Sequence, residues 1–123
     1  MLKNSDELNG MREAGKLAAE VLEMITDYVK PGISTGELDE ICFKYITDVQ
    51  KAIPANVGYR GFKKTLCTSI NQVICHGIPD TNRILKSGDI MNIDVTMFII
   101  SPDLSIRFVS GICLLYTSPS PRD

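Results

Sequence analysis

The 123-residue sequence lacks several features that would place it in a specialised class of protein. No apolar run is long enough to span a membrane, and the polar start, MLKNSDELNG, is not a secretory signal. The formal net charge is −2 without any block of like charges, which excludes the electrostatic pattern of a DNA or anionic-membrane binder. With 44% hydrophobic and 23% charged residues, the composition indicates one ordinary globular domain.

Cysteine and histidine are also scarce. The four cysteines, at positions 42, 67, 75 and 113, form no Cys-x-x-Cys pair. Scattered single cysteines in a chain without a secretory signal predict reduced thiols and a cytoplasmic location rather than disulfides. The one histidine is His76, in a Cys-His-Gly step between two short apolar runs.

Two helices are predicted in the first half of the chain. Apolar residues recur with a helical period over residues 5–28, with Asn4 or Ser5 available as the cap, and Pro31-Gly32 ends that helix. A second helix is predicted over residues 34–52, because Ser34 and Glu37 have the spacing of a capping box. The short link between the helices predicts that they pack as antiparallel neighbours.

A loop and several strands are predicted in the second half. Residues 55–64 mix glycines with the aromatics Tyr59 and Phe62, which either line a pocket or cover the edge of the core. Residues 66–70 and 73–75 are predicted as short strands, and 90–100 as the main strand. This main strand alternates Met, Ile, Val and Met on one face with polar groups on the other, and residues 105–109 are its predicted hairpin partner.

His76 and Asp94 are the residues best suited to chemistry. Asp94 lies between Ile93 and Val95 in the main strand, where a carboxylate requires a partner because burying an unpaired charge is very costly. That partner is either a divalent metal or an ion pair within the protein. Histidine with aspartate suits Mn, Fe, Co or Zn, although a single histidine is also a common structural residue.

The sequence resembles the type I methionine aminopeptidases over residues 6–96. The motifs that carry the resemblance are, in chain order, Pro31-Gly32-x-Ser34-Thr35-x-Glu37-Leu38, Gly58-Tyr59-x-Gly61-Phe62, Cys67-x-Ser69-Ile70-Asn71-x-Val73-x-Cys75-His76-Gly77-Ile78-Pro79 and Gly88-Asp89-Ile90-x-Asn92-Ile93-Asp94-Val95-Thr96. The resemblance implies an α/β (α+β) chain that forms the N-terminal half of a pita-bread fold. It also implies a hydrolase that removes the initiator methionine from nascent polypeptides.

The resemblance also implies the cofactors, partners and site residues. The expected cofactors are two divalent metal ions per complete site, drawn from Co, Mn, Fe or Zn. Asp94 matches a metal-ligand aspartate, His76 matches the catalytic histidine that contacts substrate, and Tyr59, Phe62 and Cys67 match residues around the methionine side chain. The expected partners are the N-terminal methionine of a nascent chain and the ribosome, without DNA or membrane, and the parent enzyme is expected to be a monomer.

The chain departs from the family pattern after Thr96. Asp103 is the candidate for the second aspartate ligand, but Pro102 stands where the family has glycine, so Asp103 is either a ligand or a turn residue. The family's remaining ligands, a histidine and two glutamates, are absent. We therefore expect these residues alone not to hydrolyse a Met-Ala-Ser peptide.

Residues 1–112 are therefore assigned to the N-terminal part of one aminopeptidase domain, and residues 113–123, CLLYTSPSPRD, to a tail outside the family. The hypothesis for this tail is a translated sequencing adapter, and the alternative is a real, divergent tail. Two other functional classes stay open: a non-catalytic binding protein with the same fold, and a relative of creatinase or proline aminopeptidase. The last ranks lowest, because those site sequences differ from Cys75-His76-Gly77-Ile78-Pro79.

Overall fold

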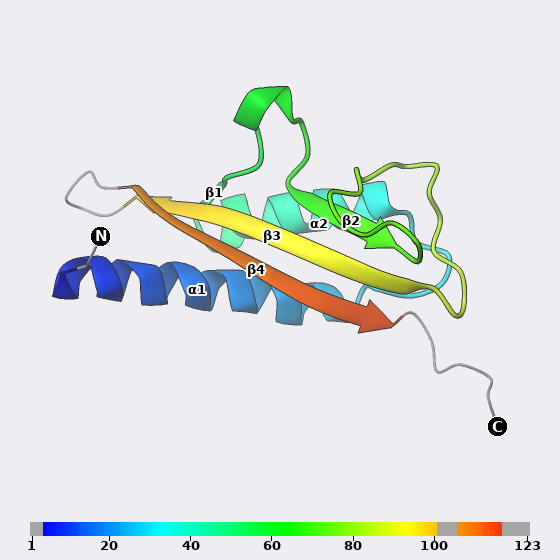
Figure 1. Cartoon of the computed structure of the whole chain (residues 1–123), viewed down its shortest axis with the longest axis horizontal. Coiled ribbons are helices and arrows are strands. Elements are labelled where there is room, and N and C mark those ends of the chain that lie inside the picture. Colours follow the sequence, from blue (N-terminus) through cyan, green and yellow to red (C-terminus); the bar gives the residue numbers. More distant parts are fainter. Residues whose placement is uncertain (1–3, 101–105, 117–123) are drawn as a thin grey trace.

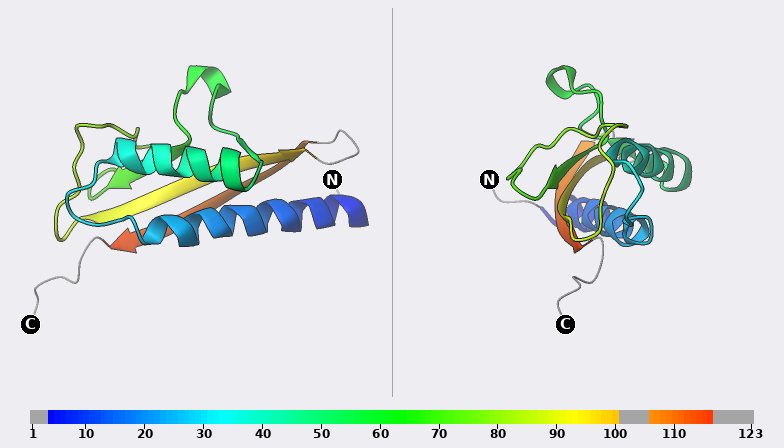
Figure 2. Two further views of the ribbon diagram at one scale, coloured as in Figure 1. Left: turned by 180° about the vertical axis from the view of Figure 1, so that it is seen from behind. Right: turned by 90° about the vertical axis from the view of Figure 1, so that its right-hand side faces the viewer.

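The computed structural model describes residues 4–100 and 106–116. Two helices, α1 (Ser5–Thr26) and α2 (Thr35–Lys44), lie side by side on one face of an antiparallel sheet (Figures 1 and 2). The strands are β1 (Ile53–Pro54), β2 (Leu66–Ile70), β3 (Ile90–Ile100) and β4 (Ile106–Tyr116). β3 is central, because β1 and β2 pair along one of its edges and β4 along the other.

Both predicted helices are confirmed, together with the way they begin. Asn4 is the cap of α1: its side chain accepts from the Glu7 amide at 2.8 Å, and Glu7 accepts from the Asn4 amide. Ser34 and Glu37 form the predicted capping box at α2. The α-helical part of the second helix is shorter than predicted, because α2 ends at Lys44 and continues as a π-helical turn, η1 (Tyr45–Val49). The helices run antiparallel, as predicted (Figure 2).

The alternation in β3 defines the core. Met91, Ile93, Val95 and Met97 are fully buried on the face that carries the helices, as the sequence predicted. They pack with apolar residues of α1 and α2 in one cluster, which includes Val21, Ile25, Leu38 and Ile46. Each such side chain contributes roughly 1.5–3 kcal/mol when removed from water. The polar residues of β3 therefore lie on the face that the helices do not cover.

The predicted strand over residues 73–75 is wrong. After β2 the chain turns at Asn71, whose φ of 54° is left-handed, and residues 73–75 lie in an irregular loop. The hairpin partner of β3 is confirmed but longer than predicted, since β4 extends to Tyr116 and pairs along β3 as far as Ile90. Asp103 lies outside the described residues. Among the helices that the structure describes, none is long and apolar enough to cross a membrane.

Candidate functional site

The loop after β2 places His76 beside that strand. Gly77, the next residue, donates its amide to Ser69 Oγ at 3.1 Å and accepts from the Thr68 amide at 2.8 Å. A side chain at Gly77 would overlap the Thr68 carbonyl oxygen, so only glycine permits this close approach. The φ of His76 is 55°, a left-handed conformation that is uncommon for a residue other than glycine and is concentrated at functional sites.

A cavity of about 260 Å³ lies beside His76. It is lined by Asn56, Tyr59, Phe62, Cys67 and His76. Three of these residues belong to the loop between β1 and β2, and Asn56 closes this loop by donating from Nδ2 to the Thr65 carbonyl at 3.1 Å. Its volume is just below the range of about 300–1,000 Å³ that is usual for ligand pockets. The space therefore suits one amino-acid side chain.

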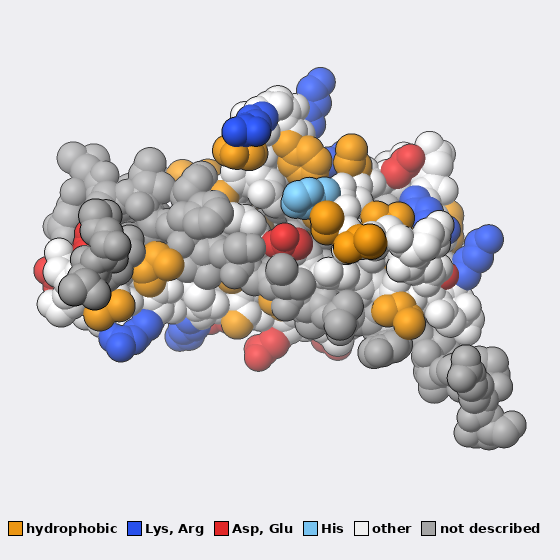
Figure 3. All heavy atoms as spheres, in the orientation of Figure 1, with side chains coloured by type: hydrophobic (Ala, Val, Ile, Leu, Met, Phe, Trp, Pro, Cys, Tyr) orange, Lys and Arg blue, Asp and Glu red, His pale blue; other side chains and the backbone are white. Residues whose placement is uncertain are grey.

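The cavity is open to solvent on the face of the sheet away from the helices. Tyr59 is 64% exposed, whereas Phe62 and Cys67 are half-buried. Figure 3 shows this face, with the histidine in pale blue and hydrophobic side chains on both sides of it. Tyr59 therefore contributes an exposed aromatic ring to the wall of an open cavity and is not part of the core.

Strand pairing connects this cavity to Asp94. Cys67 of β2 lies opposite Asp94 of β3 in the register, so the two residues are neighbours on the sheet. Burial raises the pKa of the Cys67 thiol, and the nearby negative charge of Asp94 raises it further. Asp94 itself is half-buried. The floor of the cavity is thus an uncharged thiol beside a carboxylate.

The structure brings together most of the predicted site residues. Tyr59, Phe62, Cys67 and His76 line one cavity, and Asp94 adjoins it through Cys67. Asn56 was not predicted as part of this site. No pattern in the sequence indicated Asn56, because its position at the cavity depends on loop packing and on its bond to the Thr65 carbonyl.

The fit of a metal ion can be judged from the oxygen atoms beside Asp94. Asn92 lies two residues before Asp94 on the same face of β3, and its Oδ1 is buried without a hydrogen-bond partner among the described residues. Carboxylate and amide oxygens are ligands for hard divalent ions. The described residues contain no cluster of three or more His, Cys, Asp or Glu able to hold a metal. They therefore supply part of a ligand set and not a complete centre.

Comparison with known proteins agrees with this geometry. The sequence model of metallopeptidase family M24 matches residues 9–100, which is more than half of the chain. The chain belongs to metallopeptidase family M24. Membership of the M24 family implies divalent metal ions as cofactors. The matched residues include the whole of the cavity and Asp94.

Within the M24 family, the chain is clearly similar in sequence to methionine aminopeptidases. The chain is 59% identical over 96 residues to a methionine aminopeptidase of Escherichia coli (strain K12), and 58% identical to that of Buchnera aphidicola subsp. Baizongia pistaciae. Each match covers 78% of this chain and 36% of the relative. The chain thus spans about a third of the length of these relatives.

Solved structures confirm the fold. The crystal structure of methionine aminopeptidase from Rickettsia prowazekii superposes with a TM-score of 0.85 at 41% identity, covering 97% of this chain and 45% of that one. A methionine aminopeptidase from Thermotoga maritima shares the fold at a TM-score of 0.79 and 23% identity. The predicted α+β chain, corresponding to half of a pita-bread fold, is confirmed.

Proposed function

We propose that this M24 chain contributes the methionine-binding part of a methionyl aminopeptidase, which removes the N-terminal methionine from nascent proteins. The observation that carries the proposal is the cavity in which Tyr59, Phe62 and Cys67 meet His76, one strand away from Asp94. The identity of 59% to a methionine aminopeptidase supports it. The proposed location is the cytoplasm, and the proposed partner beyond the substrate is the ribosome, with the parent enzyme a monomer.

The cavity would hold the methionine side chain. Phe62 and the ring of Tyr59 provide apolar walls, and the Cys67 thiol provides a polarizable floor for a thioether. These groups exclude water from an unbranched side chain without offering it a charge. Asn56 keeps the loop closed over that side chain through its bond to the Thr65 carbonyl.

His76 would act on the reacting peptide group at the mouth of the same cavity. Its left-handed backbone and the Gly77 bonds to β2 fix the main chain that carries the imidazole, and the imidazole itself is exposed to an incoming substrate. An imidazole there can donate a hydrogen bond to the carbonyl or amide of the scissile bond. Asp94 would hold one of two divalent ions, drawn from Co, Mn, Fe or Zn, and such ions supply activated water for hydrolysis.

A chimera tests this proposal directly. Residues 1–97 would replace the corresponding part of the E. coli relative, and methionine release from Met-Ala-Ser would be measured. We expect activity in the chimera and a loss of at least about a thousandfold with Asp94→Asn, because one oxygen of the carboxylate becomes an amide. His76→Ala should lower kcat by roughly a hundredfold or more while metal binding is retained.

Asp48→Asn is the matched control for the chimera, because Asp48 is an exposed carboxylate in η1, away from the cavity. Its activity should equal that of the unsubstituted chimera. A folded chimera that binds metal but leaves the peptide intact would contradict the proposal and favour the non-catalytic binding protein. Full activity in the Asp94→Asn chimera would remove Asp94 from the metal site.

A further inference from the structure

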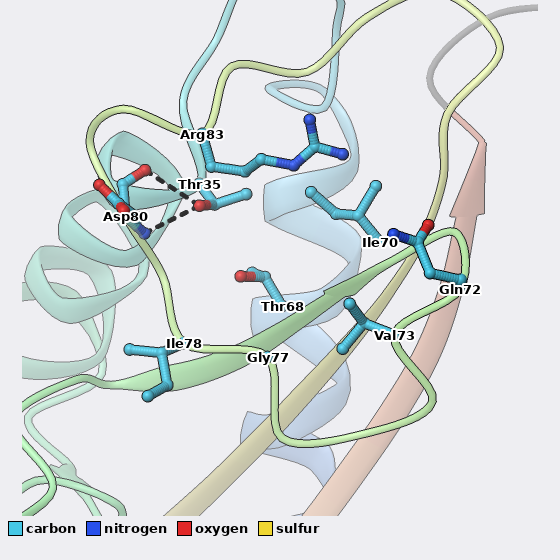
Figure 4. A pocket seen from close by; sticks show the side chains of 9 residues that line it. All are labelled: Thr35, Thr68, Ile70, Gln72, Val73, Gly77, Ile78, Asp80 and Arg83. Carbon is cyan, nitrogen blue, oxygen red and sulfur yellow. Dashed lines mark hydrogen bonds between the residues drawn. The ribbon is translucent and has the colours of Figure 1, made fainter.

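A second cavity lies on the opposite side of β2 from the methionine pocket. Its volume is about 460 Å³, within the range of small-molecule sites. It is bounded by the second half of β2, the loop over residues 72–83 and the start of α2, as Figure 4 shows. Thr68 belongs to this cavity and its neighbour Cys67 to the other, because successive residues of a strand point to opposite faces.

Thr68 presents an unsatisfied hydroxyl to this second cavity. The residue is 5% exposed, and its Oγ1 is buried with no hydrogen-bond partner among the described residues. Figure 4 shows the hydroxyl directed into the cavity, between Thr35 and Gly77. A buried hydroxyl without a partner is unfavourable, and natural proteins rarely retain one without a reason. A ligand that accepts from this hydroxyl would remove that penalty.

The other polar groups around the cavity differ in whether they are already engaged. The Thr35 hydroxyl is bound to the main chain of Asp80, accepting at 2.9 Å and donating at 3.1 Å. The Asp80 carboxylate accepts from the Asn82 amide at 2.8 Å. The Arg83 side chain, in contrast, makes only a long ion pair of 4.0 Å with Asp89 among the described residues. Its guanidinium therefore retains donors for a ligand.

We propose that this second cavity binds a small carboxylate that carries a branched aliphatic chain. Its carboxylate would accept from the Arg83 guanidinium, which matches carboxylate geometry, and from the Thr68 hydroxyl. Its aliphatic chain would lie against Ile70, Val73 and Ile78, which line the cavity together with Gln72. An inorganic anion would leave these three apolar side chains without contact.

The second cavity shares a segment with the methionine pocket. Gly77 and Ile78 line the second cavity and directly follow His76, which lines the first. The hydrogen bonds of Gly77 to Ser69 and to the Thr68 amide connect the segment to β2. Binding in the second cavity therefore changes the surroundings of His76, which gives the test a readout in both pockets.

An NMR titration of the ¹⁵N-labelled chain with 4-methylpentanoate tests the inference. We expect saturable shifts of the amides of Thr68, Gly77 and Ile78, and a smaller shift at His76. Thr68→Val keeps the shape but removes the hydroxyl, and should weaken binding about tenfold, as expected for a hydrogen bond to a charged group. Arg83→Gln should weaken binding by at least as much.

One control variant and one neutral probe test whether binding depends on Arg83 and on the carboxylate of the ligand. Arg12→Gln, which removes an exposed arginine of α1, should leave the affinity unchanged. The neutral probe 4-methylpentanamide should bind at least about tenfold more weakly. No saturable shift up to about 10 mM probe, or an equal affinity in folded Thr68→Val and Arg83→Gln, would overturn the inference. Neither metal nor peptide is present, so such a failure leaves the proposed function standing.

Discussion

Asp39 is the residue that joins a helix to the strand of the candidate site. It is 6% exposed in α2, and its Oδ1 accepts from the backbone amides of Thr65 at 2.7 Å and Leu66 at 3.1 Å. Thr65 directly precedes β2 and Leu66 is its first residue, next to Cys67. Burial raises the pKa of Asp39 above its ordinary value, although the two backbone bonds act in the opposite direction. The start of β2 is thus bound to α2 by an acidic side chain whose ionisation is disfavoured by its burial.

The raised pKa of Asp39 predicts a pH dependence of stability. A carboxyl whose pKa is higher in the folded state favours folding when protonated, so its contribution falls as pH rises from 3.8 through the raised value. Asp39→Asn retains Oδ1 as an acceptor and should abolish this contribution. Asp39→Ala leaves two buried amides without an acceptor and should cost about 1–3 kcal/mol for each. Urea unfolding of the three proteins at a series of pH values measures both effects.

Asp89 provides a control of opposite sign. Its pKa is lowered by hydrogen bonds from Asn71 and the Lys86 amide, so it stabilises the fold above its ordinary pKa and loses that effect as pH falls. The free energy of unfolding of the unsubstituted chain, minus that of Asp89→Asn, should therefore increase as pH rises. The same difference for Asp39→Asn should decrease as pH rises. Equal slopes in both variants would show that burial of Asp39 does not control its protonation.

At the scale of elements, the start of α2 organises the helix and the loop beside it. Ser34 Oγ accepts from the Glu37 amide at 3.1 Å, and Glu37 accepts from the Ser34 amide at 2.8 Å. The Ser34 amide and the Ser34 hydroxyl both donate to the Glu37 carboxylate and lower the pKa of Glu37. The next two amides, of Thr35 and Gly36, donate to the carbonyls of Arg83 and Asp80. The first turn of α2 therefore fixes the loop that follows His76.

Removal of this cap should weaken the chain measurably. We expect Ser34→Ala to lower the free energy of unfolding by about 1–2 kcal/mol, because a buried cap contributes at the upper end of the usual range. Asn4→Ala removes the corresponding cap of α1, which is exposed, and should cost about 0.5–1 kcal/mol. Urea unfolding followed by circular dichroism compares them. A larger loss in Asn4→Ala would contradict this ranking.

The strands show which elements a sequence can predict. β3 was predictable with its bounds, because Met91, Ile93, Val95 and Met97 alternate with polar residues, and these four side chains are buried against the helices. Residues 73–75 were not, since Val73, Ile74 and Cys75 are apolar but exposed. A short apolar run forms a strand only when it can pair with the edge of another strand. The left-handed turn at Asn71 directs residues 73–75 away from the sheet, so they have no such partner.

At the scale of the whole molecule, one core joins α1, α2 and β3. Ile93 is fully buried at its centre, so Ile93→Ala should lower the free energy of unfolding by about 2–5 kcal/mol. Ile74→Ala removes the same atoms from a side chain that is 90% exposed, and should change it by less than about 0.5 kcal/mol. The unfolding transitions measured by tyrosine fluorescence and by circular dichroism should coincide. A similar decrease in the free energy of unfolding in Ile93→Ala and Ile74→Ala would contradict the assignment of Ile93 to the core.

The sequence by itself determined the helices, their caps, the alternation of β3 and, through the resemblance, most of the residues that line the cavity beside His76. These features depend on local spacing or on motifs that stand close together in the chain. Only the tertiary structure decided that Cys67 lies opposite Asp94, that Asn56 closes the pocket, and that Thr68 and Arg83 face a second cavity. Strand register and loop packing decide such contacts, because they bring together residues whose separation in the chain carries no periodic signal.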